Sequence, residues 1–217
     1  MTFELFDPAS DVCVREGSCL PHWYQPGVTY FVTFRTEDSI PAHAARAWHR
    51  RRDDWLRRHG VEPGRQTWTE ALQRLPCEMQ REFHETFSRE YLEFLDRGLG
   101  ECVLRQPELA QIVMDSLRYF DGQRYHLGDL VVMPNHVHVL TCLRGTTEIE
   151  RQCYSWKKFT ATQINRRLHR QGRFWQEESF DHLVRTVEQL DAICRYIASN
   201  PIKAGLHEGE YILLSSP

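Results

Sequence analysis

Two neighbouring apolar segments, 126–133 and 136–143, constrain the fold of this chain most strongly. Both are rich in aliphatic and β-branched residues, and the second alternates from one residue to the next. Only Pro134-Asn135 separates them, and this pair is typical of a turn. Two strands joined so closely run antiparallel, because a parallel crossover needs a dozen or more residues. The sequence therefore predicts an antiparallel sheet that contains this hairpin.

Other segments predict further strands and several helices around the hairpin. Residues 28–35 are β-branched and aromatic and indicate a buried strand, and 211–214 favour a short edge strand. Apolar residues at helical spacing predict helices over 41–59, 78–97, 108–119, 150–170 and 188–200. The last helix is expected to stop at Pro201, because the residue before a proline is pushed out of the helical region. Residues 1–27 are rich in proline and glycine and indicate an irregular arm.

The order of these elements predicts an α+β fold in one domain that spans residues 1–217. A chain of 217 residues is long enough to bury a core without disulfides. The block 41–104 is long for a single connection, and we interpret it as a helical insertion within that domain.

The cysteines and the absence of targeting segments favour a cytoplasmic protein. Seven cysteines are scattered without a Cys-x-x-Cys pair, which is typical of reduced thiols. A zinc site at Cys13, Cys19 and His22 is disfavoured, because the spacing fits no standard template. The chain has neither an apolar stretch of membrane-spanning length nor a signal-peptide pattern at its start.

Charge is distributed unevenly along the chain. The net charge is -3, which argues against a protein that coats DNA by charge alone. Residues 151–206, however, contain ten basic and five acidic side chains and are therefore locally positive. Such a face suits a polyanion that is handled at one site, although a solvated helix surface explains the same pattern.

His136 and His138 are the first candidate metal ligands. Residues two apart on a strand point to the same face, so both imidazoles project together while Val137 projects to the other side. Two imidazoles on one strand provide two ligands with preset geometry. The alternative is that both histidines occupy a half-exposed sheet face without binding anything.

Tyr196 and Asn200 form a second pair, one turn apart on the last predicted helix. If this helix packs on the sheet, Tyr196 reaches a metal held by the histidines, and the Asn200 amide oxygen supplies a third ligand. The alternative is a core tyrosine followed by an asparagine that caps the helix before Pro201.

Several motifs in a fixed order resemble those of one known family. Met133-Pro-Asn-His-Val-His-Val139 resembles the histidine–hydrophobe–histidine motif of HUH single-strand endonucleases, in the form found in the single-tyrosine, REP-associated tyrosine transposases. The further matches are Trp156-Lys-Lys-Phe159, Phe174-Trp-Gln176, Phe180-Asp-His182, Arg185 and Tyr196-Ile-Ala-Ser-Asn-Pro-Ile-Lys-Ala-Gly-Leu206. The resemblance covers about 124–214 well and 28–35 loosely. The block 41–104 is longer than expected for the family.

The resemblance implies a fold, a reaction and a set of functional residues. It implies a ferredoxin-like antiparallel sheet backed by helices, with His136, His138 and Asn200 as metal ligands and Tyr196 as nucleophile. The implied reaction is metal-dependent cleavage and rejoining of single-stranded DNA through a 5′-phosphotyrosine, at repetitive palindromes that form hairpins. Histidine and amide-oxygen ligands make Mg²⁺ or Mn²⁺ the expected cofactor.

One tryptophan and four basic residues in the matched region are the expected contacts to DNA. These candidates are Trp156, Lys157, Lys158, Arg185 and Lys203. For Trp156 we favour the alternative that its ring lies in the core and only the lysines face DNA. Two other functions stay open, a hairpin-binding module without catalysis and a metal nuclease that uses water. The sequence does not decide between a monomer and a homodimer.

Overall fold

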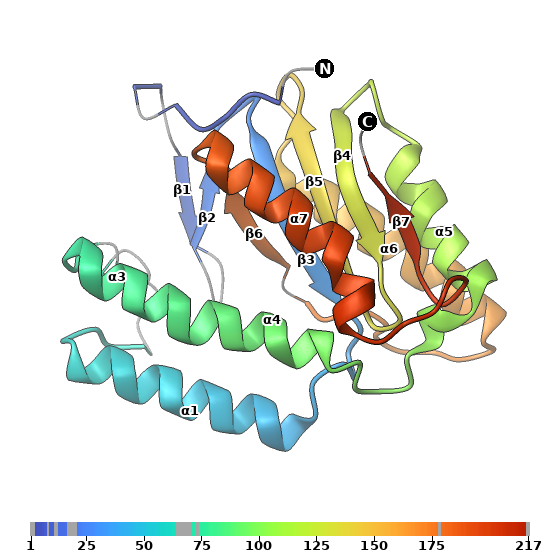
Figure 1. Cartoon of the computed structure of the whole chain (residues 1–217), viewed down its shortest axis with the longest axis horizontal. Coiled ribbons are helices and arrows are strands. Elements are labelled where there is room, and N and C mark those ends of the chain that lie inside the picture. The colour runs from blue at the N-terminus through green and yellow to red at the C-terminus, as the bar shows by residue number, and fades with distance from the viewer. Residues whose placement is uncertain are drawn as a thin grey trace.

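A five-stranded sheet forms the centre of the computed structural model, which describes residues 3–7, 9–10, 13–16, 21–63, 71–72, 74–177 and 179–215 (Figure 1). The strands lie in the order β6-β3-β5-β4-β7, and each neighbouring pair is antiparallel. Their bounds are β3 Thr29–Arg35, β4 Tyr125–Val132, β5 His136–Leu143, β6 Phe180–Leu183 and β7 Ile212–Leu214. The strands predicted from the sequence are all present, and β6 is an additional one.

The predicted hairpin is formed by β4 and β5. Val132 pairs with Val137, and the turn between the strands closes with a hydrogen bond from Met133 N to His136 O of 2.8 Å. Strand β5 lies between β3 and β4, and all of its residues are buried. It is therefore covered on both faces of the sheet.

The connections follow a ferredoxin-like plan. Helix α5 (Pro107–Arg118) joins β3 to β4 after the insertion, and helix α6 (Ile149–Arg167) joins β5 to β6. The resulting β-α-β-β-α-β order, with β6 beside β3 and β5 beside β4, is the split-βαβ arrangement. The structure thus confirms the predicted α+β class and the antiparallel sheet backed by helices.

Alternation along the strands separates two apolar layers. Tyr30, Val32 and Phe34 of β3 pack with α5 and α6 on one face. Phe31 of β3 and Leu140 of β5 pack instead with helix α7 (Val187–Lys203), which crosses the opposite face (Figure 1). The sheet therefore presents every second residue of β5 to α7.

Helix α7 ends later than the sequence predicted. Pro201 lies inside its last turn, so the prediction that it stops the helix was wrong. Asn200 keeps its helical bonding, because its carbonyl accepts a hydrogen bond from Ala204 N of 3.0 Å. The end is set by Gly205, whose φ of 67° is the left-handed conformation that glycine adopts readily after a helix.

The helical insertion has an apolar cluster of its own. It contains α1 (Ala42–Arg58) and a longer helical run made of α3 (Cys77–Phe83), a π-helical turn (His84–Ser88) and α4 (Arg89–Asp96). Figure 1 shows these two helical arms side by side. The cluster between them comprises Trp55, Leu56, Val61, Leu72, Phe83 and Phe87. A single-turn 3₁₀ helix, Val103–Arg105, follows the insertion.

The arm before β3 contains a short hairpin that the sequence did not predict. Strands β1 (Cys13–Glu16) and β2 (Pro21–Tyr24) pair with each other. The zinc ligands considered above cannot be placed there, because Cys19 and the side chains of Cys13 and His22 lie outside the described part of the chain. Among the described helices, none has the length and apolarity needed to cross a membrane.

The packing of α7 on the sheet predicts a large loss of stability when its central apolar contact is removed. Ile197 is fully buried against the sheet, whereas Ile202 on the same helix is 77% exposed. We expect Ile197→Ala to lower the free energy of unfolding by about 2–4 kcal/mol, because it leaves a cavity. Ile202→Ala should change it by less than about 0.5 kcal/mol. Urea unfolding curves measure both, and similar losses would contradict the described packing.

Candidate metal and tyrosine site

His136 and His138 project from β5 toward α7. Both side chains are fully buried, and their ring centroids lie 4.6 Å apart. Val137 and Val139, which alternate with them, enter the core on the other face. The pleat of a central strand therefore places two imidazoles together, as the spacing predicted.

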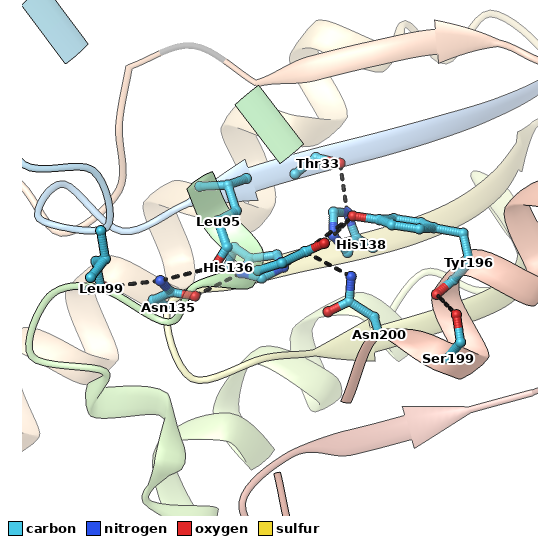
Figure 2. A network of polar contacts seen from close by, with 10 residues as sticks. Thr33, Leu95, Leu99, Asn135, His136, His138, Tyr196, Ser199 and Asn200 are labelled. Atoms are coloured by element: carbon cyan, nitrogen blue, oxygen red, sulfur yellow. Dashed lines mark hydrogen bonds and ion pairs between the residues drawn. The ribbon is translucent and has the colours of Figure 1, made fainter. Parts of the chain in front are cut away.

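Tyr196 and Asn200 approach the histidines from α7. The Tyr196 hydroxyl oxygen lies 3.2 Å from His138 Nε2, and Asn200 is fully buried. Figure 2 shows His136, His138, Tyr196 and Asn200 directed toward one another. One chain thus brings the predicted tyrosine and all three predicted metal ligands to one place.

Asp96, at the end of α4, is a member of this site that sequence reasoning missed. Its Oδ1 atom accepts hydrogen bonds from the Tyr196 hydroxyl, at 3.2 Å, and from Asn200 Nδ2, at 3.0 Å. The same oxygen lies 3.9 Å from His136 Nε2. The sequence carries a weak signal for a functional role of Asp96, because a carboxylate in the last turn of a helix is electrostatically unfavourable.

A second layer of polar groups orients the two imidazoles. His136 Nδ1 is 2.7 Å from Asn135 Oδ1, and His138 Nδ1 is 2.7 Å from Thr33 Oγ1. An amide oxygen only accepts, so His136 Nδ1 carries the proton and Nε2 retains its lone pair. The amide nitrogen of Asn135 donates to the carbonyl of Leu99, at 2.9 Å. Such outer partners fix the ring orientation of metal-binding histidines.

Burial keeps both histidines neutral at physiological pH. It lowers the pKa of His136 to about 3, and it lowers the pKa of His138 well below the usual value, with a further contribution from His136. A neutral imidazole is the form that binds a metal. His136 therefore has a free lone pair at Nε2, whereas the ring nitrogens of His138 contact Thr33 and Tyr196.

Asp96 and Tyr196 shift each other's pKa in opposite directions. Burial raises the pKa of the Tyr196 phenol, and the nearby Asp96 carboxylate raises it further. Burial also raises the pKa of Asp96, while the hydrogen bonds from Asn200 and Tyr196 oppose that shift. The phenol is consequently protonated, and it needs a positive charge nearby to become a nucleophile.

The donor atoms of this site fit a divalent metal ion. His136 Nε2 and Asn200 Oδ1 are buried, and neither has a hydrogen-bond partner among the described residues. Ligand atoms of Asp96, His136 and His138 all lie within 4.8 Å of one another. Buried polar atoms without partners are unfavourable, and a bound ion would satisfy them. Zinc is also commonly bound by histidines together with a carboxylate, so a set that includes Asp96 would fit zinc better than histidine and amide ligands alone.

The predicted DNA contacts are divided between two faces of the sheet. Lys203 is exposed, and its Nζ lies 5.5 Å from the centre of the Tyr196 ring. Arg185 is exposed just before α7 begins. Lys157 and Lys158 are on α6, which covers the opposite face, and Lys157 Nζ donates to the carbonyl of Glu177 at 2.7 Å.

Trp156 lies in the core, in agreement with the alternative favoured from the sequence. Only 1% of it is exposed, and its Nε1 donates to the Tyr125 hydroxyl at 3.0 Å. Its ring therefore offers no surface for stacking with a base in this structure.

A comparison with protein-family models supports the resemblance found in the motifs. Residues 108–200 match the family model described as "Transposase IS200 like", and this range contains His136, His138, Tyr196 and Asn200. A search of curated proteins finds no match. A solved structure of a REP-associated tyrosine transposase bound to a REP hairpin is similar over 86% of this chain and 74% of that chain, with 14% identity and a TM-score of 0.45. The family match confirms the resemblance to transposases, and the matched range does not include Asp96.

The contact between Thr33 and His138 predicts a loss of metal affinity when it is removed. Thr33→Val keeps the side-chain shape but removes the hydroxyl 2.7 Å from His138 Nδ1. We expect Mn²⁺ affinity, measured by calorimetry, to fall about 10-fold to 100-fold. Thr162→Val on the exposed surface of α6 is the control and should bind like the unmodified protein. Equal affinities of the two variants would show that this hydroxyl does not orient the imidazole.

Proposed function

From the transposase match over residues 108–200, we propose that this chain cleaves and rejoins single-stranded DNA with Tyr196 as the covalent nucleophile. The observation that carries the proposal is the 3.2 Å separation between the Tyr196 hydroxyl and His138 Nε2. His136, His138 and Asn200 are the proposed ligands of a divalent ion beside that hydroxyl. The buried Nε2 of His136 and Oδ1 of Asn200, which have no hydrogen-bond partner among the described residues, support this assignment.

The proposed reaction is a transesterification at phosphorus. The Tyr196 oxygen forms a bond to the phosphorus as the bond to the 3′ oxygen breaks, giving a 5′-phosphotyrosine and a free 3′-hydroxyl. The phenolic proton must leave, and Asp96 Oδ1 is the acceptor at hydrogen-bond distance, because His138 Nε2 is the nitrogen assigned to the ion. The leaving 3′ oxygen takes up a proton in turn, so the proton count is unchanged. A bound divalent ion would polarise the scissile phosphate and neutralise the developing charge. Because an ester is exchanged for an ester, the reverse attack reseals the strand without ATP.

The proposed substrate is a DNA hairpin with a single-stranded flank. The locally positive segment 151–206 supports binding of a polyanion. Lys203, the last residue of α7, has its Nζ 5.5 Å from the centre of the Tyr196 ring and is suited to contact a phosphate near the cleaved bond. The preference for repetitive palindromes rests on the ordered motifs alone. Nitrogen and oxygen ligands together favour Mg²⁺ or Mn²⁺ as the proposed ion, with a slight preference for Mn²⁺.

Removal of the Tyr196 hydroxyl is the direct test of this function. End-labelled hairpins with single-stranded flanks, incubated with Mg²⁺ or Mn²⁺, are expected to form a protein–DNA adduct visible on a denaturing gel. Tyr196→Phe should abolish the adduct, because the nucleophilic oxygen is gone. Tyr154→Phe, which alters an exposed tyrosine on α6, is the control and should form it normally.

Two outcomes of that experiment would contradict the proposed function and indicate a different one. If the Phe variant still cuts and leaves a free 5′ end, the protein is a metal nuclease that uses water. If the unmodified protein binds the hairpin with neither adduct nor cleavage, it is a binding module.

The role of Lys203 predicts a change in the salt dependence of DNA binding. Each phosphate contact to a single strand adds about 0.7 to the slope of log affinity against log salt. We expect Lys203→Ala to weaken binding of the single-stranded flank and to reduce that slope by about this amount. Arg118→Ala, an exposed basic residue on α5, is the control. Anisotropy titrations at several salt concentrations measure both, and an unchanged slope for Lys203→Ala would exclude this contact.

A further inference from the structure

The helical insertion ends at the metal site. Its two arms enclose their own apolar cluster, including Trp55 and Phe83, so they form a rigid unit that does not depend on the site for packing. The last residue of α4 is Asp96, and its carboxylate faces the two histidines. The insertion therefore supplies a charged group to a site otherwise built from the sheet and α7.

One buried side chain fixes this end of the insertion relative to the histidines. Asn135 is fully buried, and its Nδ2 donates to the carbonyls of Leu95, at 3.5 Å, and Leu99, at 2.9 Å. Its Oδ1 contacts His136 Nδ1 at 2.7 Å. The carbonyls on either side of Asp96 and the imidazole of His136 are thus held by the same amide.

The surroundings of the Asp96 carboxylate fit a metal ligand. Two atoms that are each about 2.1 Å from one ion lie at most about 4.2 Å apart, and Asp96 Oδ1 is 3.9 Å from the partner-free His136 Nε2. Ligand atoms of Asp96 and both histidines lie within 4.8 Å of one another. A charge in a largely buried position is stabilised when it is paired or coordinates a metal.

We propose that Asp96 is a further ligand of the divalent ion, so that the helical insertion completes the metal centre. This inference rests on the proposed function only in placing a divalent ion between His136 and His138. Asn200 Nδ2, which donates to Asp96 Oδ1, holds the carboxylate toward that ion. A mixed set of two imidazoles, an amide oxygen and a carboxylate binds a divalent cation more tightly than the same set without the negative charge.

Metal binding without DNA tests the inference. Calorimetric titration of the full chain with Mn²⁺ is expected to give an affinity at least about 10-fold weaker for Asp96→Asn than for the unmodified protein. Glu93→Gln is the matched control, since it neutralises an exposed carboxylate on the same helix, and it should leave the affinity unchanged. Equal affinities of Asp96→Asn and the unmodified protein would overturn the inference.

Two further measurements separate ligation from a structural effect. With Co²⁺ as the probe, loss of a ligand should change the visible absorption spectrum of Asp96→Asn, whereas Glu93→Gln should keep the spectrum of the unmodified protein. Thermal unfolding in the presence of a chelator should give similar midpoints for all three proteins. An unchanged Co²⁺ spectrum for a folded Asp96→Asn protein would also overturn the inference.

The inference and the proposed function fail in different ways. If the unmodified protein forms the DNA adduct while Asp96→Asn binds Mn²⁺ normally, the function holds and Asp96 is not a ligand. If the unmodified protein forms no adduct while Asp96→Asn loses Mn²⁺ affinity, the metal centre holds and the proposed reaction is wrong.

Discussion

The site depends on the antiparallel pairing of β5 with both of its neighbours. The register sets Thr33 and Val131 opposite His138, so the strand cannot shift along either neighbour without breaking both ladders. A slip of one residue would turn the imidazoles into the apolar core and bring Val137 and Val139 toward α7. The same hydrogen bonds that stabilise the sheet therefore decide which face of β5 carries the two histidines.

Much of this arrangement could be predicted from local sequence patterns. Alternation fixed the common face of His136 and His138, and helical spacing fixed that of Tyr196 and Asn200. The end of α7 could not be predicted from Pro201 alone, because a proline in the last turn leaves the bond from Ala204 to Asn200 intact. Asp96 could not be predicted from local patterns, because it lies 100 positions from Tyr196 in the sequence and no helical or strand periodicity links positions so far apart.

The position of Asp96 changes the interpretation of the helical insertion. From the sequence, the insertion was only a block longer than expected for the family. In the structure, the insertion carries a carboxylate to within hydrogen-bond distance of the tyrosine and the asparagine. Because its arms are rigidified by their own apolar cluster, the carboxylate is presented by a preformed support. A segment outside the family match is therefore part of the polar network at the site.

Helix α7 is tied to the sheet at both ends, by β6 before it and by β7 after it. Only residues 184–186 join β6 to the helix, and three residues extend over about 10 Å at most. Tyr196 therefore stays near the imidazoles for as long as β6 remains in the sheet. Exchange of α7 between two copies of the chain would require β6, an edge strand, to separate from β3 first. The short connection thus limits how far α7 can move from the imidazoles while β6 stays paired with β3.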